Sequence, residues 1–101
     1  ETYGVPVEEI SEGIKNGVRK VNIDTDLRMA SSGSVRRHLA ENKSNFDPRK
    51  FLAESTKAMT EICKARYETF GTAGNADKIT ERSMEVMFTE YESGALDPKV
   101  N

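Results

Sequence analysis

The stretch GVRKVNIDTDLR, residues 17–28, decides which fold this sequence can adopt. Its apolar residues Val21 and Ile23 alternate with polar ones, and this alternation predicts a strand over residues 18–23. A strand needs neighbours, because its backbone N–H and C=O groups pair with those of other strands. The remaining sequence contains no second strand of comparable strength. We therefore expect the strand to pair with segments outside this chain.

Four helices are predicted from apolar residues at helical spacing and from capping residues. Pro6 suits the first helical position of the first helix, and Asp47 is a typical N-cap residue ahead of the third. The second helix is thin, because residues 30–34 read Ala-Ser-Ser-Gly-Ser, and a thin helix can pack closely against another. The predicted ranges are 6–16, about 25–41, 48–70 and about 83–93, with a loop at 71–78.

The order helix, buried strand, helix is typical of the end of a βα-repeat fold. We therefore predict the α/β fold class and a chain that is one piece of a larger domain. In a structure of this chain by itself, the strand should be unpaired on both edges. The apolar faces of the helices should be exposed for the same reason.

Composition limits the classes of function. Of the 101 residues, 36% are hydrophobic and 32% are charged, and the mean hydropathy is -0.66. The net charge of -2 argues against nucleic acid as the main partner, because phosphate binding usually needs a basic excess. No apolar run approaches the roughly 20 residues of a membrane span, and no signal peptide is visible. A single cysteine, Cys63, allows no internal disulfide, which fits a cytoplasmic protein.

Polar residues stand where an α/β fold binds its ligands, at the carboxyl end of the predicted strand. Asn22 offers a donor and an acceptor, and Asp24 offers an acceptor or a base. Thr25 adds a hydroxyl and a backbone N–H at a helix N-terminus, which attracts phosphate. Helix capping explains Asp24 and Thr25 equally well, but it does not explain Asn22. The residues by themselves leave capping and ligand binding both open.

Other polar residues favour structural interpretations. Arg49 suits bidentate phosphate binding, but exposed arginines are common in helices. His38 and Cys63 lie in different predicted helices and do not make a metal site. The GTAG loop, residues 71–74, follows a helix rather than a strand, so it is interpreted as a connector. One face of the last helix is expected to pack within the domain or against a partner subunit; it contains Met84, Met87, Phe88 and Tyr91.

These motifs resemble a known family. GVRKVNIDTDLR is similar to the last barrel strand and the following helix of class II fructose-1,6-bisphosphate aldolases. The resemblance continues through FDPRKFL, CKARYETFGTAGNA and SGALDPKV, and it is closest to the bacterial subtype associated with the Calvin cycle. It implies the C-terminal part of a (β/α)8 TIM barrel, with the last strand and the C-terminal helices. Residues 1–41 would be the last helix-strand-helix of the barrel, and about 42–101 a C-terminal helical extension.

The resemblance implies a lyase that reversibly cleaves fructose 1,6-bisphosphate to dihydroxyacetone phosphate and glyceraldehyde 3-phosphate, in glycolysis, gluconeogenesis and the Calvin cycle. It implies catalytic and substrate-binding roles for Asn22, near the developing enediolate, and for Asp24, on the substrate hydroxyls. Thr25 would help to hold the phosphate of dihydroxyacetone phosphate. Arg49 would bind the other phosphate across a subunit interface. A homo-oligomer, dimer or tetramer, is implied.

The family's zinc ligands, catalytic aspartate and Gly-rich phosphate loop lie upstream in the barrel and have no match here. The resemblance therefore implies zinc bound by residues absent from this chain, no metal ligand within it, and a fragment that is inactive by itself. The other partners would be the rest of the aldolase barrel and the sugar bisphosphate.

Two alternatives remain open. One is a tagatose-bisphosphate aldolase, whose substrate differs at one stereocentre. The other is a non-catalytic helical interaction module, with the methionine-rich last helix as its docking face. The orphan strand argues against the module, because a module that folds by itself should not carry one.

Overall fold

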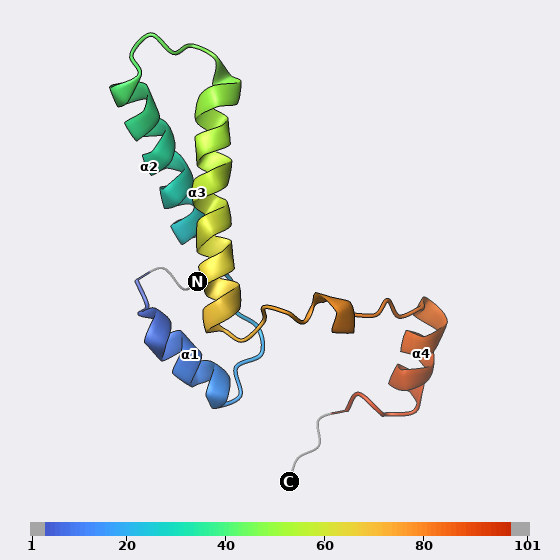
Figure 1. The fold of residues 1–101 in the computed structure, drawn as a ribbon. Coiled ribbons are helices and arrows are strands. Elements are labelled where there is room, and N and C mark those ends of the chain that lie inside the picture. The colour runs from blue at the N-terminus through green and yellow to red at the C-terminus, as the bar shows by residue number, and fades with distance from the viewer. Residues whose placement is uncertain (1–3, 98–101) are drawn as a thin grey trace.

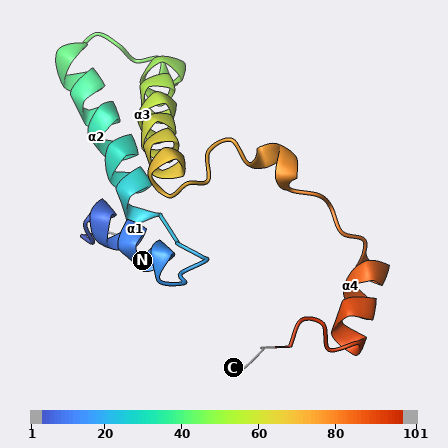
Figure 2. The same cartoon turned by 60° about the horizontal axis from the view of Figure 1, so that its bottom comes forward.

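The structure is a computed structural model that describes residues 4–97 (Figure 1). The end of the SGALDPKV stretch, residues 98–100, lies outside these residues. Helices α2 and α3 lie side by side and antiparallel, and we call them the hairpin (Figures 1 and 2). In chain order the elements are α1 (Val7–Lys15), α2 (Thr25–Glu41), α3 (Pro48–Thr69), the 3-10 helix η1 (Ala76–Lys78) and α4 (Met84–Glu92).

The predicted strand is wrong for this chain. Residues 4–97 contain no strand, and residues 18–24 form an irregular connection between α1 and α2. A strand is held by its neighbours, and the described part of the chain supplies none. The described fold is therefore all-helical rather than α/β. The predicted alternation is still seen in the burial of the side chains. Val21 and Ile23 are half-buried, while Asn22 and Asp24 are exposed.

Helix ends fall close to the predicted positions. Asp47 is the N-cap of α3 and accepts a hydrogen bond of 3.0 Å from the backbone N–H of Arg49, with Pro48 as the first helical residue. Pro6 is the N-cap of α1 rather than its first helical residue, so the helix begins one residue later than predicted, at Val7. Gly71, with φ of 72°, lets the chain leave α3 in a left-handed conformation that other residues rarely adopt.

Small side chains bring α2 and α3 together, as the thin second helix predicted. Ser34 is 5% exposed and Ser55 is 3% exposed. The hydroxyl oxygens of Ser31 and Ser55 lie 2.6 Å apart in a hydrogen bond between the helices. The hydroxyl of Ser34 donates to the carbonyl of Ser31 at 2.8 Å, so the polar atoms of this contact are satisfied.

The opposite face of α3 carries a stripe of charged side chains at helical spacing. All six of them are exposed, as on a solvated face; they are Lys50, Glu54, Lys57, Glu61, Lys64 and Glu68. The face toward α2 is half-buried at Met59, Ile62 and Cys63. This division of the helix is what an amphipathic surface helix requires.

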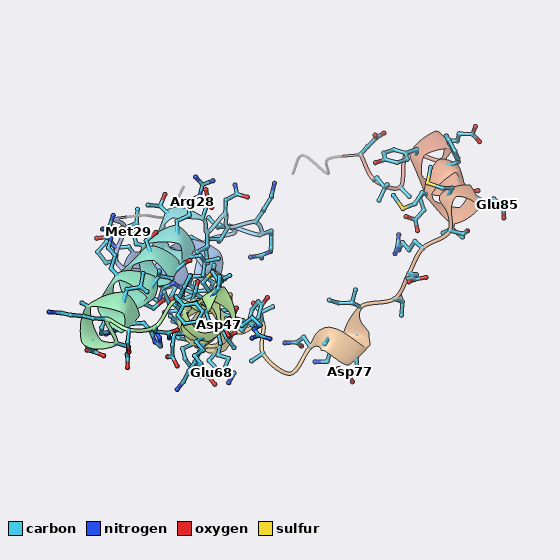
Figure 3. The ribbon with its side chains drawn as sticks, turned by 90° about the horizontal axis from the view of Figure 1, so that it is seen from above. Arg28, Met29, Asp47, Glu68, Asp77 and Glu85 are labelled. Atoms are coloured by element: carbon cyan, nitrogen blue, oxygen red, sulfur yellow. The ribbon has the colours of Figure 1, made fainter. Side chains whose placement is uncertain are left out.

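Apolar side chains are exposed over much of the molecule, as predicted. Among residues 4–97 no hydrophobic side chain is buried, and Phe46 is 90% exposed. Helix α4 stands away from the hairpin in all views (Figures 1 to 3), and its Met84 is 69% exposed. The radius of gyration is 19.6 Å, against about 13 Å for a compact domain of this length. These surfaces require further partners to cover them.

None of the helices within residues 4–97 is both long enough and apolar enough to cross a bilayer.

The serine contact yields a prediction for stability. Ser34→Leu should lower the free energy of unfolding by about 1–3 kcal/mol, because the longer side chain must push α3 away. Ser32→Leu is the matched control: Ser32 is exposed on the same helix, and its replacement should change stability by less than about 0.5 kcal/mol. Denaturant unfolding of both variants measures the difference. Equal stability of the two would contradict the close helix contact.

Candidate functional site

Three of the four predicted site residues lie together at the start of α2. Asn22 is exposed in the connection that precedes the helix, Asp24 is the N-cap residue, and Thr25 is the first helical residue. The backbone N–H groups of the first turn of a helix carry a partial positive charge, which favours an anion. One short segment therefore supplies an amide, a carboxylate, a hydroxyl and these N–H groups.

Asp24 does not use its side chain to cap α2. Its Oδ1 instead accepts a hydrogen bond of 2.9 Å from Nε of Arg28, one turn along the helix (Arg28 is labelled in Figure 3). Asp24 is thus the N-cap residue, as the capping interpretation predicted, but its side chain does not cap the helix. A carboxylate has a second oxygen, so this ion pair leaves Asp24 able to accept from another group.

A second carboxylate on this turn, Asp26, pairs with α3. Its Oδ2 lies 3.4 Å from Nη2 of Arg66, and both side chains are 22% exposed. The two residues are 40 positions apart, so this ion pair fixes the start of α2 against the last turns of α3. Removing either side chain would leave the charge of the other unpaired in a half-buried position.

These two arginines change the electrostatics around Thr25. Asp24 and Asp26 flank Thr25 in the sequence, and two bare carboxylates would repel an incoming phosphate. Arg28 and Arg66 each neutralise one of them. The start of α2 can therefore attract an anion in spite of its acidic sequence.

Sequence reasoning missed Arg28 and Arg66 as parts of this site. The spacing of Asp24 and Arg28 is i,i+4, which is the helical ion-pair spacing and a usable signal. Arg66 lies on the half-buried face of α3 that contains Met59, Ile62 and Cys63. An arginine on such a face usually pairs with an acidic side chain. The sequence did not identify that partner, because Asp26 is brought to it only by the helix packing.

The fourth predicted residue, Arg49, lies at the opposite end of the hairpin. It is the second residue of α3, its side chain is 90% exposed, and its guanidinium grips the carboxylate of Asp47. Nη2 of Arg49 lies 2.7 Å from Oδ2 of Asp47, and Nε lies 3.0 Å from Oδ1. The hydrogen bonds from the Arg49 side chain and then its backbone N–H hold the pKa of Asp47 below its ordinary value, and the same pair raises the pKa of Arg49.

The hairpin separates Arg49 from the other three residues. Thr25 begins α2, which has 17 residues, and a helix of that length spans about 25 Å. Arg49 begins α3, which runs back antiparallel to α2 (Figure 1). Thr25 and Arg49 therefore lie too far apart for one small molecule to touch both within a single chain.

The interpretations of His38 and the GTAG loop agree with the structure. His38 is half-buried, and its Nε2 lies 2.6 Å from Nδ2 of Asn45 in the loop between α2 and α3. In the GTAG loop, Nδ2 of Asn75 donates to the carbonyls of Gly71, Thr72 and Ala73 at 3.1 Å each. The carbonyl oxygens of this loop therefore converge on one amide, whereas an anion-binding loop needs converging N–H groups.

No zinc site is found in the part of the chain that the structure describes. In the described range, 4–97, no three His, Cys, Asp or Glu side chains are grouped so as to hold a metal ion. Cys63 is a half-buried free thiol between α2 and α3. The expectation that zinc ligands are supplied from outside this chain stays a prediction.

Comparison with known proteins gives the family. Residues 2–75 match the family model described as fructose-bisphosphate aldolase class-II. The chain is 68% identical over all 101 residues to the fructose-bisphosphate aldolases of Pseudomonas aeruginosa and Stutzerimonas stutzeri, and it covers 28% of the length of each. It is 58% identical to fructose-bisphosphate aldolase 2 of Rhodobacter capsulatus, of which it covers 89%.

The chain belongs to the class II fructose-bisphosphate aldolase family. It spans about a quarter of the length of the first two relatives, 28% in each case.

The Arg49–Asp47 pair yields a prediction for titration. Arg49→Met should raise the pKa of Asp47 toward its ordinary value, because the hydrogen bonds from the guanidinium are lost; carboxyl NMR measures it. The paired carboxylate stabilises the start of α3 above the ordinary pKa, and this stabilisation disappears as the pH falls through the lowered pKa. Lys50→Met, which removes only a weaker charge effect, should shift the pKa of Asp47 less. Equal shifts in both variants would contradict the assigned cause.

Proposed function

We propose that this chain is the C-terminal part of a class II fructose-bisphosphate aldolase, and that the whole protein reversibly cleaves fructose 1,6-bisphosphate to dihydroxyacetone phosphate and glyceraldehyde 3-phosphate. The observation that carries the proposal is the 68% identity, over every residue of this chain, to two proteins of that name. The grouping of Asn22, Asp24 and Thr25 at a helix N-terminus supports it.

In the whole protein, residues 18–23 would become the last strand of the barrel, and residues 42–101 a helical extension. The burial pattern supports this, because Val21 and Ile23 already turn toward α1 and α3 while Asn22 and Asp24 turn outward. Adding neighbouring strands would pair the backbone without changing which side chains face the substrate. The barrel would also cover apolar surface that this chain leaves exposed.

Each site residue would have a separate task. The amide of Asn22 would hydrogen-bond the oxygen on which negative charge develops during cleavage. Asp24, steadied by Arg28 at 2.9 Å, would accept hydrogen bonds from substrate hydroxyls and fix the reacting carbons. Thr25 would bind a phosphate through its hydroxyl and the N–H groups of the first turn of α2. Asp24 and Thr25 stand at the start of α2, which holds them on one rigid element, and Asn22 lies in the connection just before it.

Arg49 would bind the second phosphate in the site of a neighbouring subunit. Its separation from Thr25 by the length of the hairpin supports this, because one substrate cannot reach both within a chain. Asp47 would hold the guanidinium so that the N–H groups not used by Asp47 are left to donate to a phosphate. The proposal requires a homo-oligomer, dimer or tetramer, and the exposed apolar face of α4 supplies surface for such contacts.

The zinc ion of the class would be held by residues outside this chain, since residues 4–97 contain no suitable group of ligands. When bound, it would act as a Lewis acid on the substrate ketone. The chain by itself would then be inactive. We further propose a cytoplasmic enzyme of the Calvin-cycle subtype. A tagatose-bisphosphate aldolase is the second candidate within enzymes, and the names of the relatives favour the fructose substrate.

The first test of this proposal is Asn22→Ala in the whole protein. The variant should cleave fructose 1,6-bisphosphate about a hundredfold more slowly, because a hydrogen bond to the developing charge is lost. A chelator should abolish wild-type activity, and zinc should restore it. Asn16→Ala, at the exposed C-cap of α1, is the control and should keep full activity. Full activity of Asn22→Ala would mean that this segment only precedes a helix, and the site assignment would be withdrawn.

Subunit mixing tests the role of Arg49. Oligomers of Asn22→Ala or of Arg49→Ala subunits should each be nearly inactive on fructose 1,6-bisphosphate. Dimers reassembled from an equal mixture should regain about a quarter of wild-type activity, because half of them contain one site with both residues intact. A mixture as inactive as its parents would place Arg49 outside the neighbour's site.

A further inference from the structure

We infer that Arg66 is a positioning residue for the substrate site, acting through Asp26 to hold and to neutralise the segment that carries Asn22, Asp24 and Thr25. The inference rests on the proposed function, and it adds to it a residue of α3 that would not touch the substrate. Its basis is the ion pair between Nη2 of Arg66 and Oδ2 of Asp26 at 3.4 Å.

This ion pair differs from the others in its burial and its reach. Both side chains are 22% exposed, whereas the pair of Asp24 with Arg28 is 57% and 78% exposed and lies within one helix. An exposed pair contributes little to structure, whereas a half-buried pair between two elements is less screened by solvent and links those elements. The pair joins the turn that contains Thr25 to the last turns of α3.

Arg66 also lies near the residues that flank Asn22. It lines two adjoining hollows, and Val21 and Ile23 line both of them. These two residues flank Asn22, so the same arginine lies beneath the connection and beside the helix start. Nε of Arg66 is buried and has no hydrogen-bond partner among residues 4–97, so the guanidinium is held there by Asp26 and by packing.

Charge gives Arg66 a second effect at the site. Asp26 is next to Thr25, where the proposed function puts a phosphate. Without Arg66, the carboxylate of Asp26 would repel a phosphate bound at Thr25, because charges in a half-buried position are less screened by solvent. Substrate binding should therefore respond to the charge of residue 66, and a second change that removes the charge of Asp26 should compensate.

The test measures KM and kcat for fructose 1,6-bisphosphate with the whole protein. Arg66→Met should raise KM about five- to tenfold, because the phosphate then faces an unpaired carboxylate. Arg66→Lys keeps the charge and should stay within about threefold of wild type. Asp26→Asn added to Arg66→Met should bring KM back toward the wild-type value. Lys64→Met is the matched control, since Lys64 is two residues away on the exposed stripe, and it should leave both constants unchanged.

The outcomes separate this inference from the proposed function. Wild-type protein that does not cleave the substrate would overturn the proposed function. Active wild type, with Asn22→Ala impaired and Arg66→Met unchanged, would overturn this inference by itself. A merely structural Arg66 would lower kcat in proportion to lost active sites, with KM unchanged and no compensation by Asp26→Asn. That result would also overturn the inference.

Discussion

The close contact of α2 with α3 is the interaction on which the rest of the described structure depends. Ser34 and Ser55, at 5% and 3% exposed, are small enough to let the two helices meet. The hydroxyl of Ser55 pairs with that of Ser31, and the hydroxyl of Ser34 donates to the carbonyl of Ser31, so both are satisfied. This contact fixes the register of the hairpin. The register in turn brings Asp26 to Arg66 at one end, and it holds Arg49 far away at the other.

The hairpin thereby divides the site chemistry between two ends of one rigid element. The start of α2 collects an amide, a carboxylate and a helix N-terminus, with arginines that cancel its acidic charge. The start of α3 presents one exposed arginine held by one carboxylate. Rigid elements hold side chains more accurately than loops do, and the proposed function assigns the two ends of the hairpin to two different sites of an assembly.

The exposed apolar surface has a single physical explanation. A chain without a buried hydrophobic side chain among residues 4–97 gains little from burial by itself. The strand prediction failed for the same reason, since both a strand and an apolar helix face need a neighbour to cover them. Helix ends were predicted well, because Asp47, Pro48 and Gly71 act through local backbone geometry that needs no neighbour.

The sequence by itself determined the helices, their caps, the charged stripe of α3 and the identity of Asn22, Asp24, Thr25 and Arg49 as candidates, because each of these depends on residues close together in the chain. Its motifs also indicated the family to which the chain belongs. Only the tertiary structure decided that Asp26 meets Arg66 and that Arg49 lies a helix length away from Thr25. Those facts depend on how α2 packs on α3, which is set by contacts between residues up to 40 positions apart.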